Sequence, residues 1–137
     1  MKRILLVMVA ILGMVTVNAQ GYLGSSKAEI QENAVKYGWV LKYDTLDSGT
    51  NYIQMTNSPD NVSWVFFLND ENIVSSSILD LLTPQAMGEY LQAINNVMAQ
   101  MSPKEWRSYQ DWGVIYAKLT PETEDRYPYL TFTFETY

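Results

Sequence analysis

Hydrophobic positions recur with two different periods along this chain, so both helices and strands are predicted. The first period is helical, because Ile30, Ala34 and Tyr37 fall on one helix face. Residues 26–29, SKAE, form a capping box, in which the serine oxygen accepts a backbone N–H and the glutamate reaches back. Gly38 suits the left-handed position just past a helix end. The first helix is therefore predicted to run to about Tyr37.

From Trp39 the period changes to two, which predicts strands. Four strands are predicted, at residues 39–46, 51–56, 62–68 and 73–79, and the polar segments 47–50 and 57–61 form turns. The third of these strands, VSWVFFL, is apolar on both faces, as in a central strand that is covered on both sides.

A second helix is predicted to open at Thr83, with Pro84 in its first turn, where the missing N–H costs nothing. Its apolar stripe comprises Met87, Tyr90, Leu91, Ile94, Val97, Met98 and Met101. A second capping pattern at residues 102–105 predicts a further short helix that carries Trp106 and Tyr109. Two last strands are predicted at 112–119 and 129–136.

This order, helix-β-β-β-β-helix-β-β, predicts an α+β fold. We expect a mostly antiparallel sheet of about six strands with two main helices on one face. The segments 38–43 and 112–116 are weakly similar, since both follow a predicted helix and both start a strand. Residues 20–137 are predicted to form a single domain, because so few residues rarely build two cores.

The first twenty residues resemble a secretory signal peptide. Lys2 and Arg3 precede an apolar run of 14 residues, and Val17-Asn18-Ala19 precedes Gln20. The run is shorter than the roughly 20 residues that cross a bilayer. We therefore predict a signal peptide at 1–19, export to the periplasm or the extracellular space, and no membrane insertion after cleavage. The chain has no cysteine, so lipid attachment to cysteine and disulfides are excluded.

The charge balance bears on the partners. The net charge is −6, and removal of Lys2 and Arg3 makes it −8. An acidic chain of this kind has no general attraction for nucleic acid or for anionic lipid. Neither is expected as a partner.

The chain contains no histidine and no cysteine, which excludes triads built on those residues and the usual zinc ligands. No catalytic residue, metal or cofactor is predicted. The alternative is a small carboxylate-dependent hydrolase acting on glycans, which needs two suitably spaced acids. Its candidate acids are Asp70, Glu71, Asp80 and Glu89. The acidic run at 69–72, NDEN, is interpreted as a hairpin tip, because a calcium loop needs more oxygen ligands.

The remaining candidate site is an aromatic surface. If the helices cover the Trp64 and Phe66 face of the sheet, the opposite face carries Val65 and Phe67. Tyr52, Tyr116 and Tyr129 would join them from other strands. Trp106 and Trp112 would offer further rings in the segment 106–112. The same rings could instead form a second core layer or the contact of a homodimer.

The chain resembles the small exported proteins of unknown function found in Bacteroidetes. The resemblance rests on the signal ending at residues 17–20, the cysteine-free acidic domain, Tyr90 on the second helix and Lys104-Glu105-Trp106. It implies a periplasmic or extracellular location and assigns no functional residue. The expected function is therefore a secreted, non-catalytic binding domain for a protein, a glycan or a second copy of itself.

Overall fold

The structure is a computed structural model that describes residues 20–57 and 62–137. The predicted signal peptide at 1–19 and residues 58–61 of the predicted turn lie outside the described residues. No helix within the described ranges is long and apolar enough to cross a membrane.

The described residues fold as two helices and eight strands, so the α+β class is confirmed and the expected number of about six strands is wrong. In chain order the elements are α2 (Lys27–Tyr37), β1 (Val40–Thr45), β2 (Asn51–Asn57), β3 (Val62–Leu68), β4 (Val74–Leu81), α3 (Pro84–Val97), β5 (Ala99–Ser102), β6 (Glu105–Gln110), β7 (Gly113–Thr120) and β8 (Tyr129–Thr136). Along the described residues, a helix followed by four strands therefore occurs twice.

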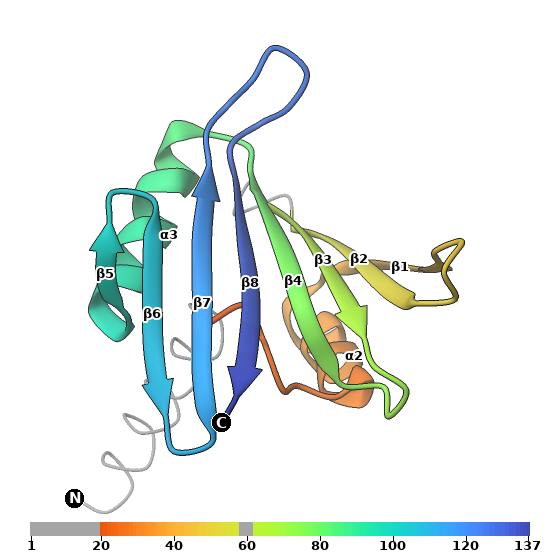
Figure 1. The fold of residues 1–137 in the computed structure, drawn as a ribbon. Coiled ribbons are helices and arrows are strands. Elements are labelled where there is room, and N and C mark those ends of the chain that lie inside the picture. The colour runs from red at the N-terminus through yellow and green to blue at the C-terminus, as the bar shows by residue number, and fades with distance from the viewer. Residues whose placement is uncertain (1–19, 58–61) are drawn as a thin grey trace, which may run out of the picture.

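All eight strands join one antiparallel sheet in the order β1-β2-β3-β4-β8-β7-β6-β5. Both helices lie behind this sheet in Figure 1, so they cover one face and leave the other uncovered. Strands β4 and β8 meet in the centre and join the two halves. Only four residue pairs connect these two strands, from Ser77↔Phe132 to Asp80↔Tyr129.

The ends of both helices follow the predicted capping chemistry. The Ser26 hydroxyl accepts the N–H of Glu29 at 3.1 Å, and Gly38 adopts a left-handed conformation with φ 70° at the other end of α2. In α3 the Thr83 hydroxyl accepts the N–H of Ala86 at 3.1 Å, and Pro84 occupies the first turn. The predicted caps at Ser26, Gly38 and Thr83 are confirmed.

The short third helix is a wrong prediction, and its failure explains two of the missing strands. The α3 helix ends at Val97, and the chain continues as the hairpin of β5 and β6. The Ser102 hydroxyl accepts the N–H of Lys104 at 3.4 Å and so organises a turn rather than a helix start. In β6 burial alternates with period two, with Trp106 and Ser108 buried and Arg107 exposed between them.

The hydrophobic core lies between the sheet and the two helices. Trp64 stacks on Phe66 and on Phe132, and Tyr22 contacts Trp64 and Phe66 edge-to-face. The largest side chains of this core are Trp64, Trp106, Phe66, Phe132, Ile30, Ile53, Met55, Leu79, Leu81, Ile94, Leu130 and Val62. Since Trp64 and Phe132 come from β3 and β8, the core connects the two halves of the sheet.

Residues 20–26 form a segment that we call the N-terminal wedge, because it lies beside β4 at the end where β4 and β8 are no longer paired (Figure 1). The Gly24 N–H donates to the Val74 carbonyl at 3.0 Å, and the Val74 N–H donates to the Ser25 carbonyl at 2.8 Å. The buried Ser77 hydroxyl donates to the Gly21 carbonyl at 2.7 Å. Tyr22 adds a buried ring. The first residues after the predicted cleavage site are therefore part of the core.

Candidate binding face

The sheet presents one face that neither helix covers, which we call the open face. In β3 the residues Val62, Trp64, Phe66 and Leu68 are buried, and the residues between them are partly exposed. Because side chains alternate along a strand, Val65 and Phe67 point away from the helices. The registers extend this face across the sheet to Tyr52, Gln54, Ser76, Ile78, Asp80, Thr131, Tyr129, Tyr116, Lys118 and Arg107.

The N-terminal half of the open face is the more apolar one. Tyr52 lies opposite Phe67, and their ring centroids are 6.1 Å apart at an angle of 49°. Val65 lies opposite Ile78 on the next strand. All four side chains are half-buried. They form an apolar strip across β2, β3 and β4 that the described helices do not cover.

The C-terminal half combines rings with charges. The Arg107 guanidinium lies 5.3 Å from the centroid of the Tyr116 ring, and that of Arg126 lies 3.7 Å from the centroid of Tyr129. Arg126 also pairs with Asp80 at 3.5 Å. Such cation–π contacts place a cation on the ring face that a sugar would otherwise use for stacking.

Two groups on this half titrate away from their ordinary values. Burial raises the pKa of Tyr116, and the hydrogen bond that its hydroxyl donates to the Glu135 carboxylate at 3.1 Å adds to the rise. A hydrogen bond with the Tyr109 side chain raises the pKa of the Arg107 guanidinium, which therefore stays charged. Both shifts are upward, so at neutral pH the Tyr116 phenol is neutral and the Arg107 guanidinium is charged, as at their ordinary pKa values, and the effect of the Tyr116 shift appears only at alkaline pH.

Four of the six predicted surface residues lie on the open face, with Tyr52 and Phe67 in contact in its N-terminal half and Tyr116 and Tyr129 separate from them in its C-terminal half. Trp106 does not, and its prediction is wrong: it is 2% exposed and points to the helix side, where its indole N–H donates to Asn95 Oδ1 of α3 at 2.7 Å. Because the strand period was missed there, the ring was placed on the surface instead of in the core.

Trp112 lies apart from the open face. It occupies the turn between β6 and β7, is 48% exposed, and contacts Phe134 edge-to-face at 5.6 Å. Phe134 has the same strand parity as the buried Phe132, so this contact belongs to the helix side. The predicted position of Trp112 at an element boundary is confirmed. The open-face ring nearest to it along the chain is Tyr109 of β6, which lies opposite Val114.

Arg107, Tyr109 and Arg126 are neighbours of the aromatic rings that sequence reasoning missed. The first two follow from the alternation of β6, in which Trp106 and Ser108 point inward. Arg126 lies in the long loop before β8, where no periodic pattern fixes a position. The alternation was a readable signal, whereas the position of Arg126 depends on tertiary structure.

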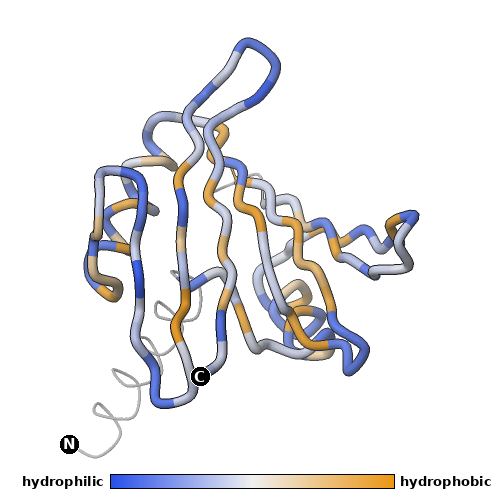
Figure 2. Tube along the Cα trace, in the orientation of Figure 1, coloured by the Kyte–Doolittle hydropathy of each residue, from blue (hydrophilic) through white to orange (hydrophobic). Residues whose placement is uncertain are grey.

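The acidic run at 69–72 is the tip of the β3–β4 hairpin, as predicted. The Asn69 side-chain oxygen accepts the N–H groups of Glu71 and Ile73 at 2.9 and 3.0 Å, and Asn72 has a positive φ of 59°. The hydrophilic tip is clear in Figure 2. The Asn69 amide oxygen therefore accepts backbone N–H groups of the same hairpin. Among the described residues no group of three or more acids, histidines or cysteines could hold a metal.

The four candidate carboxylates lie in different places. Asp70 and Glu71 are exposed at the hairpin tip beyond one end of β4, while Asp80 lies near its other end. Glu89 is exposed on α3 and accepts a hydrogen bond from Gln85 at 3.2 Å. A glycosidase requires two carboxylates on either side of one bond. These four residues provide no such pair.

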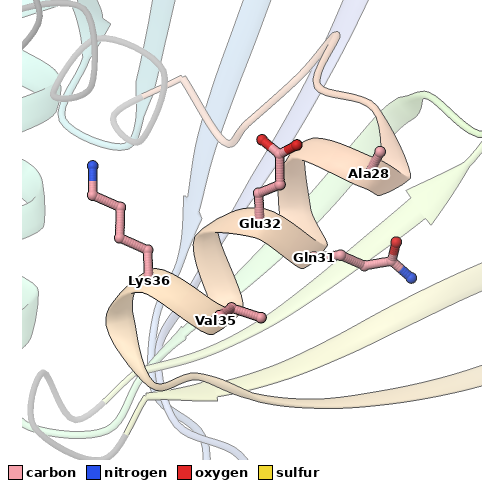
Figure 3. A pocket seen from close by; sticks show the side chains of 5 residues that line it. All are labelled: Ala28, Gln31, Glu32, Val35 and Lys36. Atoms are coloured by element: carbon pink, nitrogen blue, oxygen red, sulfur yellow. The ribbon is translucent and has the colours of Figure 1, made fainter.

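A shallow open hollow runs along the outer side of α2 and is lined by Ala28, Gln31, Glu32, Val35 and Lys36 (Figure 3). All five residues come from one helix, so the hollow has no opposing wall among the described residues. We do not assign a ligand to it. Its relevance is to the neighbouring strand β1, because the Gln31 amide donates to the Tyr43 hydroxyl at 3.1 Å.

The chain matches no protein-family model, no curated protein and no solved structure.

Proposed function

We propose that this chain is an exported, non-catalytic domain that binds a partner protein on the open face. The observation that supports the proposal is the apolar strip of Tyr52, Phe67, Val65 and Ile78, which is half-exposed on central strands. Partly exposed apolar side chains gathered on one face are typical of an interaction surface.

A protein partner fits this face better than a glycan. Sugars stack on open aromatic faces, and the rings of Tyr116 and Tyr129 already carry guanidinium groups. The apolar strip on the other half of the face combines one Phe, one Tyr and two aliphatic residues, which suits an apolar segment of a protein. Lys118 on β7 and Arg107 on β6 lie two and three strands beyond the strip on the same face, where they would favour acidic groups on the part of a partner that extends there.

The dispersed carboxylates argue against the hydrolase alternative, since a catalytic pair needs convergence. Export is supported by the signal-like residues 1–19 and by the N-terminal wedge. Gln20 already contributes to the fold, because its side-chain amide donates to the Ser108 hydroxyl at 3.1 Å. Cleavage after Ala19 would leave the whole wedge in place. N-terminal sequencing of the protein from its native host should therefore begin at Gln20.

The binding proposal is tested by placing a photo-crosslinking phenylalanine analogue at position 67 in the full chain, expressed in the native host. We expect a crosslink to one defined protein. Phe134 is the matched control, because it is also a Phe near the surface, 38% exposed, but lies on the helix side. Crosslinks at position 67 only would support the open face as the binding surface.

The companion variant is Phe67→Ser. It should abolish the partner interaction and change the free energy of unfolding by no more than about 1 kcal/mol, because the ring is only half-buried. A loss of several kcal/mol would mean that the ring is core, and equal crosslinking at positions 67 and 134 would mean that the face has no special role. Binding to a glycan panel that depends on Phe67 would replace the protein partner with a sugar.

A further inference from the structure

The outer edge of β1 carries a pattern that fits a second copy of the same strand. The strand lies at one end of the sheet, so among the described residues no other strand pairs with its outer side. Exposed apolar side chains concentrate around it. Of the eleven large apolar residues that are exposed in the described chain, five lie between positions 35 and 46, namely Val35, Tyr37, Val40, Tyr43 and Leu46.

The backbone of β1 determines which residues can pair outward. In an antiparallel ladder alternate residues direct both N–H and C=O to the same neighbour. The Leu46 N–H donates to the Thr50 carbonyl at 2.8 Å, on the β2 side. The even-numbered residues therefore bond toward β2, and Leu41, Tyr43 and Thr45 direct their groups outward.

The outward groups limit the registers of a two-fold strand pair. Residues that direct their backbone groups outward in one copy must lie opposite such residues in the other copy. The two-fold axis therefore passes through a residue of the strand and not between two residues. Centred on Lys42, the pair would place lysine opposite lysine, and centred on Asp44 it would place aspartate opposite aspartate. Like charges directly opposite each other destabilise a strand pair.

The register centred on Tyr43 is complementary at each position. Lys42 then faces Asp44 of the second copy, and Asp44 faces its Lys42. Val40 faces Leu46 at the ends of the pair, and Leu41 faces Thr45. Tyr43 faces itself on the axis. Lys42 and Asp44 occupy the non-hydrogen-bonded positions, where opposite side chains are closest, at a Cα separation of about 4.5 Å.

From this register we infer that β1 is a homodimer interface, in which two copies pair antiparallel across a two-fold axis through Tyr43 and form one continuous sixteen-stranded sheet. The outward pairs supply about six backbone hydrogen bonds, two at each of three pairs. A lone lysine on an edge strand repels its own copy. Here Asp44, two residues further on, provides the opposite charge.

One contact changes when the strands pair. In the single chain the Asp44 carboxylate accepts the outward N–H of Thr45 at 2.8 Å. In the dimer this N–H donates to the Leu41 carbonyl of the second copy, and the Asp44 carboxylate turns to Lys42 of that copy. The axis is perpendicular to the sheet, so the open faces of both copies lie on the same side. The inference does not depend on the proposed partner.

A charge-reversal experiment on the exported full-length protein tests the register. Sedimentation velocity over micromolar to millimolar concentrations should show a monomer–dimer equilibrium, weak because an edge-to-edge contact is small. Lys42→Asp or Asp44→Lys alone places like charges opposite at two positions and should weaken dimerisation about tenfold or more. Lys42→Asp combined with Asp44→Lys restores both opposite-charge pairs and should bring the dissociation constant back to within about threefold.

Crosslinking gives a second, independent test of the same register. The chain has no cysteine, so single thiols can be introduced without interference. At Tyr43→Cys the two Cα atoms lie about 5.5 Å apart across the axis. At Leu41→Cys they are four residues apart along the strand, about 13 Å. A short bis-maleimide should link the first variant and not the second.

Three outcomes would overturn the inference. The first is a protein that stays monomeric at millimolar concentration. The second is a dimer whose dissociation constant is the same after either single reversal or is not restored by the double reversal. The third is equal crosslinking at positions 41 and 43. Circular dichroism of each variant distinguishes an unfolded chain from a folded monomer.

Discussion

The two halves of the molecule, residues 27–81 and 84–136, share one layout and differ at their outer edges. Each half is a helix followed by four antiparallel strands, and β4 and β8 meet at the centre. The outer strand of the C-terminal half, β5, has only four residues and an irregular register between Gln100 and Ser102. The outer strand of the N-terminal half, β1, has six residues in regular register with β2.

This difference indicates that the two edges are not equally open to pairing. Short strands and irregular registers are common ways of blocking an edge, and β5 uses both. In β1 the charges of Lys42 and Asp44 disfavour pairing with a strand that lacks matching charges. They are complementary to the charges of a second, antiparallel copy of β1. On the proposed dimer register, the β1 edge is available for assembly, whereas the short and irregular β5 edge is not.

The largest effects should come from the core tryptophans, one in each half. Trp64→Ala should lower the free energy of unfolding by about 3–5 kcal/mol, because the ring is 1% exposed. Its ring contacts Phe66 in its own half and Phe132 in the other. Hydrogen exchange should therefore accelerate in both halves.

Trp106→Ala is the matched change in the C-terminal half. It should also cost about 3 kcal/mol or more, since this ring is 2% exposed. Its loss should accelerate exchange mainly in β5, β6 and α3, since its indole is bonded to Asn95. If Trp64→Ala accelerated exchange in the N-terminal half alone, the shared core would not join the halves.

The next effect concerns the N-terminal wedge, which lies beside β4 at the joint between the halves. Gly21→Ala should cost about 2–4 kcal/mol, because an alanine at φ 74° is strained and its Cβ would overlap the Phe132 ring. Gly24→Ala is the control, with φ 84° and no atom within 4 Å of the added Cβ.

The control should cost about 1–2 kcal/mol from the backbone conformation alone. Denaturant unfolding of both variants measures the difference. Equal losses would mean that the contact with Phe132 is relieved by a small shift of the wedge, and that the wedge is not a fixed part of the joint.

The sequence predicted elements whose signals are local. The caps at Ser26, Gly38 and Thr83, the central strand β3 and the hairpin tip at 69–72 all depend on neighbouring residues, and the structure confirms them. The prediction for the residues after Val97 is wrong because it also depended on a local signal. Ser102-Pro103-Lys104-Glu105 satisfies a helix cap locally, but pairing with β7 makes the following residues a strand.

The candidate site was partly predictable in the same way. Strand alternation relative to Trp64 placed Phe67 and Tyr52 together, because period two and antiparallel order are sufficient for that. The register that brings Arg107 to Tyr116 depends on the position of β6 in the sheet. The sequence predicts a short helix in place of β6, so this register could not be predicted. Arg126 reaches Tyr129 and Asp80 through a loop turn, which no periodic signal encodes.

The smallest expected effect is a loss of folding stability at alkaline pH, caused by Tyr116 on the C-terminal half of the open face. Since the pKa of Tyr116 is raised in the folded protein, the folded state holds this proton more tightly than the unfolded chain. The resulting stability is present below the unfolded pKa of about 10 and is lost as pH rises through the folded pKa.

Tyr116→Phe should therefore flatten the alkaline fall of the melting temperature and leave its value near neutrality almost unchanged. Glu135→Gln should produce an intermediate slope, because the burial of Tyr116 remains while the charged acceptor is removed. The measurement is thermal unfolding between pH 8 and pH 11, a range chosen to span the roughly pH 10 reference value. A slope for Tyr116→Phe equal to that of the unmodified protein would assign the alkaline loss to other groups.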